Sequence, residues 1–137
     1  MMVLNVVFAG TFFVFALLSS CTSILPTEAS VDEPILLALN QSKSLPRGPV
    51  LRFVSVEEDS RCPTGVQCVW AGNAKVRIDA TFDGQTQRLD LNTTVEPKSG
   101  TAFDYSIELL DVMPASTTPP QPESTYSVRL RAEKRGG

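Results

Sequence analysis

The clearest pattern in the chain is a strict alternation of apolar and polar side chains over residues 74–82, AKVRIDATF. A period of two predicts a β-strand with one buried face. Asp83-Gly84 follows, a pair preferred in two-residue hairpin turns because both central residues need positive φ. Residues 86–91 are therefore expected to return as a second strand.

This turn also predicts the register of the hairpin. Counting outward from it pairs Phe82 with Gln85, and places two pairs of opposite charge on the outer face and two apolar pairs on the inner face. The charged pairs are Asp79 with Arg88 and Arg77 with Asp90, and the apolar pairs are Ile78 with Leu89 and Val76 with Leu91. A slip of one residue would exchange the buried and exposed faces, so both patterns select the same pairing.

Five further strands are expected from short apolar or alternating runs between turn signals. They are residues 35–40, 50–57, 66–70, 103–112 and 126–132. In 103–112 the inward positions are Phe103, Tyr105, Ile107 and Leu109, and Val112 has the other parity, which predicts a bulge near Leu110. In the last strand Tyr126, Val128, Leu130 and Ala132 are expected to point inward.

About seven short strands without a helical period predict an all-β domain over residues 35–135. We expect an antiparallel two-sheet sandwich of immunoglobulin-like type, with a small β-barrel as the alternative. Residues 114–124, PASTTPPQPES, cannot join a sheet and are expected to form a long exposed loop.

The beginning of the chain reads as a targeting signal. Residues 1–20 carry no charged side chain, and the apolar run 6–18 is shorter than the roughly 20 residues of a membrane span. Leu18-Ser19-Ser20-Cys21 resembles a bacterial lipobox. The resemblance implies cleavage before Cys21, lipidation of its thiol and, because Thr22 follows, the outer membrane where a cell has two membranes. An ordinary cleaved signal and, less favoured, an uncleaved helical anchor are the alternatives, and residues 21–34 are expected to be a tether.

Composition excludes several functions. The net charge of −3, with acids and bases interspersed, disfavours nucleic acid as a partner. Histidine is absent, which removes the commonest general base and the commonest imidazole metal ligand. No G-x-S-x-G or S-x-x-K motif is present, so we expect no enzyme, no catalytic residue, no metal and no cofactor.

Once Cys21 is assigned to lipid, Cys62 and Cys68 remain as a pair that is expected to form a disulfide in an oxidising compartment. Pro63-Thr64-Gly65 supplies a turn between them, with proline at its second and glycine at its fourth position.

Three roles of this loop stay open. It could be a structural staple with Trp70 plugging the core, a redox site, or a recognition loop. For recognition, the candidate partner-binding residues are Asp59, Arg61, Pro63 and Trp70.

The segments DSRCP (59–63) and CVWAGNA (68–74) resemble a recurrent pattern in small uncharacterised bacterial secreted proteins and lipoproteins. The resemblance extends from Leu37 through the strand at Tyr126. It implies a fold and a location but carries no activity with it.

Together these features predict a lipid-anchored, non-enzymatic β-sandwich of the bacterial envelope. Such a module would bind a protein or glycan partner or have a structural role. The alternative is an inhibitor of an extracytoplasmic hydrolase that acts through the loop from Asp59 to Cys68.

Overall fold

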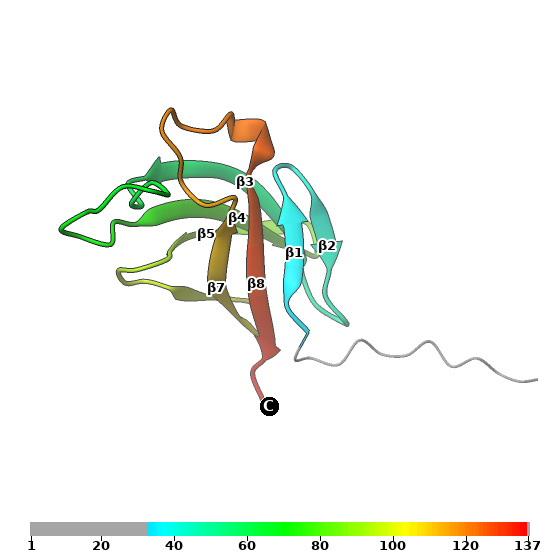
Figure 1. Cartoon of the computed structure of the whole chain (residues 1–137). Helices are drawn as coiled ribbons and strands as arrows, with labels where there is room; N and C mark the ends of the chain where they lie inside the picture. The colour runs from blue at the N-terminus through cyan, green and yellow to red at the C-terminus, as the bar shows by residue number, and fades with distance from the viewer. Residues whose placement is uncertain (1–32, 137) are drawn as a thin grey trace, which may run out of the picture.

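The computed structural model describes residues 33–136, so the signal segment, Cys21 and nearly all of the expected tether lie outside the described residues. The described chain forms eight strands in two antiparallel sheets of four (Figure 1). The elements are β1 (Ile35–Ala38), β2 (Ser42–Ser44), β3 (Val50–Asp59), β4 (Ala74–Phe82), β5 (Gln85–Asn92), β6 (Ser99–Ala102), β7 (Tyr105–Met113), the 3-10 turn η1 (Glu123–Thr125) and β8 (Ser127–Lys134).

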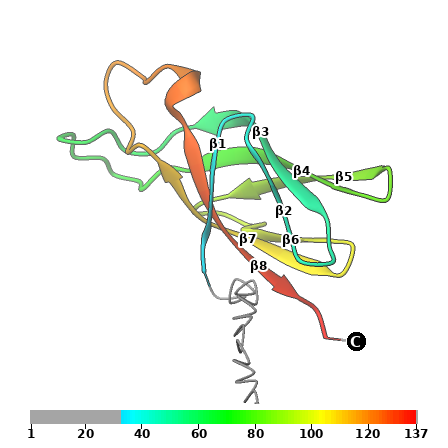
Figure 2. The same cartoon turned by 90° about the vertical axis from the view of Figure 1, so that its right-hand side faces the viewer.

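The predicted all-β sandwich is confirmed, and the strands form two separate sheets rather than one closed barrel. The orders are β1-β8-β7-β6 and β2-β3-β4-β5 (Figure 2). Apart from β1 with β8, every hydrogen-bonded neighbour is consecutive in the chain. The connections are therefore meanders, unlike the Greek-key connections of immunoglobulin domains.

The core lies between the inner faces of the two sheets. Side chains at alternate positions of the long strands are buried, as the period of two requires. Phe53 and Ile78 of one sheet and Ile107 and Leu130 of the other are fully excluded from solvent. Burial of these apolar side chains against one another is the main favourable term that holds the sheets together.

The predicted hairpin of β4 and β5 is confirmed pair by pair, from Phe82 opposite Gln85 to Val76 opposite Leu91. Both expected ion pairs form on the outer face: Arg77 Nε lies 2.8 Å from Asp90 Oδ1, and Arg88 Nε lies 2.9 Å from Asp79 Oδ1. Asp83 and Gly84 have φ of 49° and 73°, as the two-residue turn demands.

The bulge predicted near Leu110 is confirmed by a register shift between Leu109 and Asp111 in the pairing of β7 with β8. It places Val112 in the core together with Leu109. The expected start of this strand was wrong, because Phe103 belongs to the turn before β7 and has a φ of 54°.

Three other expectations about strands need correction. Residues 66–70 form no strand, because they belong to a loop that leaves the sheet. Two short strands, β2 (SKS) and β6 (SGTA), were missed, since neither shows alternation or β-branched apolar residues. The result is eight strands instead of about seven.

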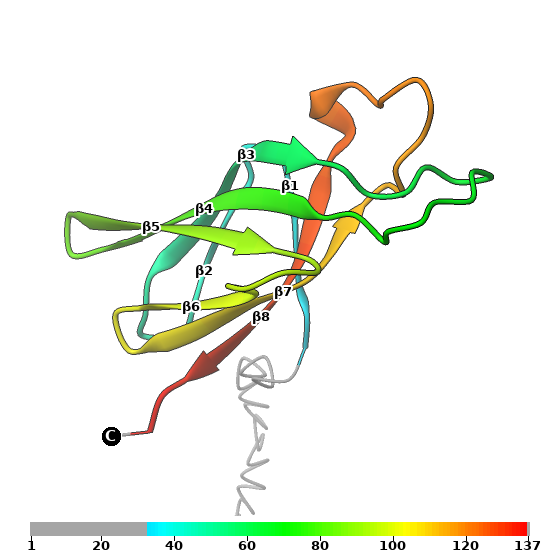
Figure 3. The same ribbon diagram turned by 90° about the vertical axis from the view of Figure 1, so that its left-hand side faces the viewer.

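Antiparallel meanders place successive connections at alternate ends of the sandwich. The β3–β4 loop and the β7–β8 loop both project from the same end of the sandwich, and β1 begins beside the middle of β8, at Leu130, and runs toward that end (Figures 1 and 3). The predicted exposed loop at residues 114–124 is confirmed, with η1 at its end. These two neighbouring loops contain the candidate site.

The packing of the core predicts a sharp contrast between two apolar truncations. Ile78→Ala should lower the free energy of unfolding by about 2–5 kcal/mol, because it empties space in a core that excludes solvent. Leu36→Ala, at a side chain that is 58% exposed, should change it by less than about 0.5 kcal/mol. Urea unfolding followed by far-ultraviolet circular dichroism measures both, and equal losses would contradict this assignment of the core.

Candidate functional site

The candidate site is the loop of residues 60–73, which joins β3 to β4 and extends beyond the other connections at its end (Figure 3). Its two arms continue the pairing of the strands. The amide of Ser60 donates to the carbonyl of Asn73 at 2.7 Å, and that of Cys62 to the carbonyl of Ala71 at 3.2 Å. The base of the loop is therefore a stem held by backbone hydrogen bonds.

Gly72 permits the close approach of the two arms. Its φ is +70°, and a Cβ at this position would lie 1.9 Å from the carbonyl oxygen of Ser60. Both the dihedral angle and the contact exclude a side chain. The stem can close only with glycine at this position.

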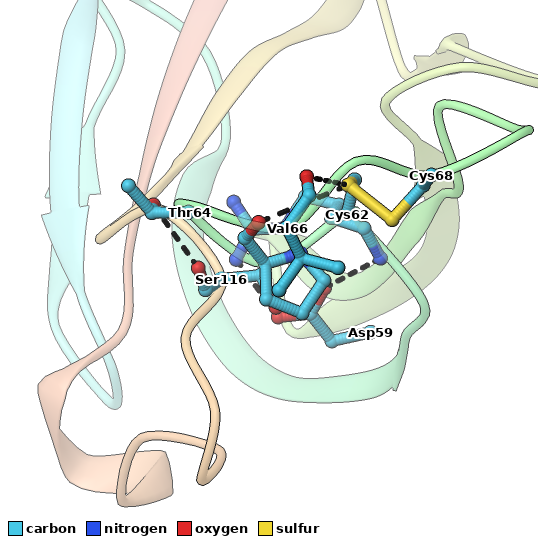
Figure 4. The surroundings of a disulfide bond; sticks show 8 residues. Asp59, Cys62, Thr64, Val66, Cys68 and Ser116 are labelled. Carbon is cyan, nitrogen blue, oxygen red and sulfur yellow. Dashed lines mark hydrogen bonds and ion pairs between the residues drawn. A yellow bond between two sulfur atoms is a disulfide. The ribbon is translucent and has the colours of Figure 1, made fainter.

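The predicted disulfide between Cys62 and Cys68 is present, with the two Cα atoms 5.9 Å apart (Figure 4). The turn inside the ring begins one residue later than expected. The amide of Val66 donates to the carbonyl of Pro63 at 3.2 Å, and Gly65, with φ +80°, is the third residue of the turn. Glycine is needed there because that position requires positive φ, as in a type II turn.

The β7–β8 loop supports the disulfide ring from the side. The amide of Thr64 donates to the carbonyl of Ser116 at 2.9 Å, and Figure 4 shows the two residues facing each other. The long proline-containing segment therefore does more than connect two strands, since it braces the turn of its neighbour.

Arg61 and Asp59 form the base of the loop. Arg61 Nε donates to Asp59 Oδ1 and Nη2 to Oδ2, both at 2.8 Å, and the side chains are only 15% and 12% exposed. The guanidinium also donates to the carbonyls of Val112 and Pro114. The hydroxyl of Tyr126 donates to Asp59 Oδ2 at 2.8 Å. This cluster of Asp59, Arg61 and Tyr126, the clamp, joins the end of β3 to the ends of β7 and β8 in the other sheet.

The clamp favours its charged form at neutral pH. The hydrogen bonds from Arg61 hold the pKa of Asp59 below its usual value, against the opposing effect of burial, and Tyr126 lowers it further. Burial raises the pKa of Tyr126, and its hydrogen bond to the Asp59 carboxylate adds to that rise. The pKa of Arg61 is raised chiefly by its hydrogen bonds to Asp59.

The loop also exposes apolar side chains to solvent. Its large exposed apolar side chains are Val66 in the turn of the ring and Val69 and Trp70 beyond the disulfide, and we call these three residues the tip; their exposed fractions are 52%, 90% and 82%. Trp70 does not plug the core, so that interpretation is wrong. Residues 62–74 contain no charged side chain, hence the tip is neutral and the charges lie at the base.

The structure thus separates the four predicted partner-binding residues. Asp59 and Arg61 lie at the base with their polar atoms engaged, and Pro63 begins the turn of the ring. Only Trp70 is presented to solvent, together with Val66 and Val69, which were not predicted as contacts. The uncharged run that contains them was the available signal, but its short apolar pattern between turns predicts a strand instead.

Within residues 33–136, no group of three or more histidine, cysteine or acidic side chains is arranged to hold a metal ion. In the same part of the chain, no helical segment has the length and apolar character needed to cross a membrane. A shallow hollow is lined by Phe103, Asp104, Lys134 and Arg135. These residues are distant in sequence from the loop of residues 60–73.

Comparisons of the chain with protein-family models, with curated proteins and with solved structures found no match.

The geometry of the stem predicts unequal effects at two glycines that share a positive φ. Gly65→Ala should cost about 1 kcal/mol of unfolding free energy, for its dihedral angle alone, because nothing lies near the added methyl group. Gly72→Ala should cost about 3 kcal/mol, because the methyl group collides with the backbone of Ser60. Urea unfolding and hydrogen exchange of the Ser60 and Cys62 amides test this, and similar effects at both positions would contradict the stem.

The clamp predicts a specific loss of stability in acid. Since the folded pKa of Asp59 lies below its unfolded value, its contribution is complete above about pH 4 and is lost as the pH falls through the folded pKa. Asp59→Asn should cost about 2 kcal/mol at pH 7, and this difference from the wild type should shrink below pH 4.

Asp111→Asn is the matched control, because Asp111 pairs with Arg129 at an exposed site and should cost less than about 1 kcal/mol. Urea unfolding between pH 2 and 7, followed by circular dichroism, measures all three proteins. A difference between wild type and Asp59→Asn that stays constant down to the lowest pH would speak against the clamp.

Proposed function

We propose that this protein is a lipid-anchored, non-enzymatic module of the bacterial envelope that binds its partner through the loop of residues 60–73. The observation that carries the proposal is the combination of a strongly restrained loop with a solvent-exposed apolar tip. A structural staple alone does not account for large apolar side chains that face water.

The restraints on the loop support a binding role. Backbone hydrogen bonds close the stem, the disulfide closes the ring, Ser116 braces the turn, and the clamp fixes the base. A loop that is already ordered loses less conformational entropy on binding. Exposed apolar side chains gathered within one loop are typical of interaction sites.

Lipid attachment at Cys21 rests on the lipobox resemblance of residues 18–21. Acyl chains stabilise attachment by about 0.8 kcal/mol for each buried methylene group, so several chains make a durable anchor. Thr22 favours the outer membrane in a cell with two membranes. The tether would enter the domain at β1, which begins away from the loop, beside the middle of β8 (Figure 1).

A non-enzymatic role agrees with the side chains of the site. The chain has no histidine, and the only carboxylate in the clamp, Asp59, accepts hydrogen bonds from Arg61 and Tyr126. A general base needs a free lone pair within reach of a substrate proton. Asp59 offers none toward the tip.

Inhibition of an extracytoplasmic hydrolase is the second candidate, favoured by the projection of a disulfide-closed loop from one end of the sandwich (Figure 3). The clamp changes how this candidate is tested. Arg61→Ala would loosen the base of the loop rather than remove a contact, so Trp70→Ala is the informative variant. Hydrolase inhibition that Trp70→Ala abolishes while circular dichroism stays unchanged would support inhibition.

The anchor predicts the fate of the chain in a bacterial host. The full chain should be recovered with membranes, and mass spectrometry should find Cys21 as the first residue carrying acyl chains. A Cys21→Ser chain produced behind an ordinary cleaved signal in place of residues 1–20 should move to the soluble fraction, because it lacks both the acyl chains and the apolar run of residues 6–18.

The double variant Cys62→Ser with Cys68→Ser is the matched control and should stay with the membranes. An unmodified Cys21 in the native protein, or a Cys21 bridged to Cys62 or Cys68, would refute lipid anchoring.

A further inference from the structure

We propose that the tip formed by Val66, Val69 and Trp70 inserts into the surface of the bilayer in which Cys21 is anchored. The inference rests on the proposed function, and it names a lipid surface as the ligand of the loop. If Cys21 is anchored, the bilayer lies close to the domain, and the exposed apolar side chains of the tip can contact it.

The side chains of the tip suit the boundary between lipid and water. Tryptophan is enriched there because its ring is apolar and its indole N–H can still reach polar groups. No charged side chain in residues 62–74 has to be desolvated on insertion. The charges that flank this run are Arg61, which is paired with Asp59 at the base, and Lys75 in β4.

The size of the tip favours a bilayer over a protein partner. With an indole taken as about 200 Å², the three side chains expose roughly 400 Å² in total. A stable protein interface buries about 800 Å² on each partner, so the tip alone provides about half of that area. A chain that is already anchored needs a much smaller buried area to hold its tip in the bilayer, because the anchor keeps the tip at a high effective concentration near the lipid.

The length of the tether allows the tip to reach the membrane. β3 has 10 residues and spans at most roughly 33 Å, and four residues of each arm of the loop add about 13 Å, so the tip lies at most about 45 Å from the beginning of β3. β1 begins beside the middle of β8 and runs toward the end that carries the loop, so the tether enters within a similar distance. The 14 residues from Cys21 to Ile35 can extend to about 48 Å. The sandwich is therefore able to lie along the surface with both contacts in place.

The single tryptophan of the chain makes the test direct, since all indole fluorescence comes from Trp70. The full mature chain would be studied in two forms: lipidated and reconstituted into phosphatidylcholine vesicles, and as the soluble Cys21→Ser protein titrated with the same vesicles. We expect the emission of Trp70 to shift to the blue and to be quenched by brominated phosphatidylcholine in both forms.

Two matched substitutions report whether the tip makes the contact. Val69→Asp should weaken partition of the soluble chain into vesicles by about tenfold, because a charge enters the lipid boundary. Val95→Asp, the same change at a 52% exposed valine in the β5–β6 connection, should leave partition unchanged. Equal effects of both variants would overturn the proposal.

The remaining outcomes separate this inference from the proposed function. An acylated Cys21 together with unquenched, red-shifted Trp70 emission in vesicles would refute insertion of the tip and leave the anchor intact. Tip insertion without acylation of Cys21 would refute the anchor alone.

A blue shift that needs no lipid and grows with protein concentration would assign the tip to a second copy of the chain. A shift that appears only after envelope proteins are added would assign it to a protein partner. Both of these results would overturn the proposal.

Discussion

The clamp of Asp59, Arg61 and Tyr126 is the interaction on which the shape of the candidate site depends. Arg61 donates to the Asp59 carboxylate with two nitrogens and also to the backbone carbonyls of Val112 and Pro114. One guanidinium therefore ties the end of β3 in one sheet to the end of β7 in the other. Removing one partner of such a mostly buried pair leaves the other charge uncompensated, so the cost exceeds that of breaking an exposed ion pair.

The restraints of the loop are ordered from its base to its tip. Above the clamp, Gly72 lets the arms of the stem approach closely, then Ser116 holds Thr64, and the disulfide closes the ring. The polar and charged groups of the loop and its base make hydrogen bonds to each other and to neighbouring segments, whereas the large apolar side chains of the tip face solvent. This is the reverse of the arrangement in the sandwich, where alternate apolar side chains are buried. The inversion is the physical basis for assigning a binding role to the loop.

The parts of the fold that could be predicted are those in which side-chain pattern and local turn chemistry agree. The β4–β5 hairpin combines alternation, an Asp-Gly turn and complementary charges, and each of its expected pairs is present. The bulge in β7 was predictable because it changes the parity of apolar positions. β2 and β6 were not, since SKS and SGTA carry no pattern and pair only because their neighbours offer free edges.

The candidate site could be predicted only in part. The disulfide followed from counting cysteines, but the surroundings of Arg61 and Trp70 depend on contacts between residues far apart in the chain. The carbonyl partners of Arg61 come from residues 112 and 114, and no local signal marks them. Burial of Trp70 in the core was only one of the roles that the sequence left open for this loop, and the 82% exposed fraction of its side chain excludes that role.

The central claim, a rigid loop that presents an apolar tip to solvent, is tested most directly by the fluorescence of Trp70 in the soluble domain without lipid or partner. The account predicts ready quenching by acrylamide together with an anisotropy that decays only through tumbling of the whole domain. An indole shielded from acrylamide, or one whose anisotropy is lost through fast local motion, would contradict it.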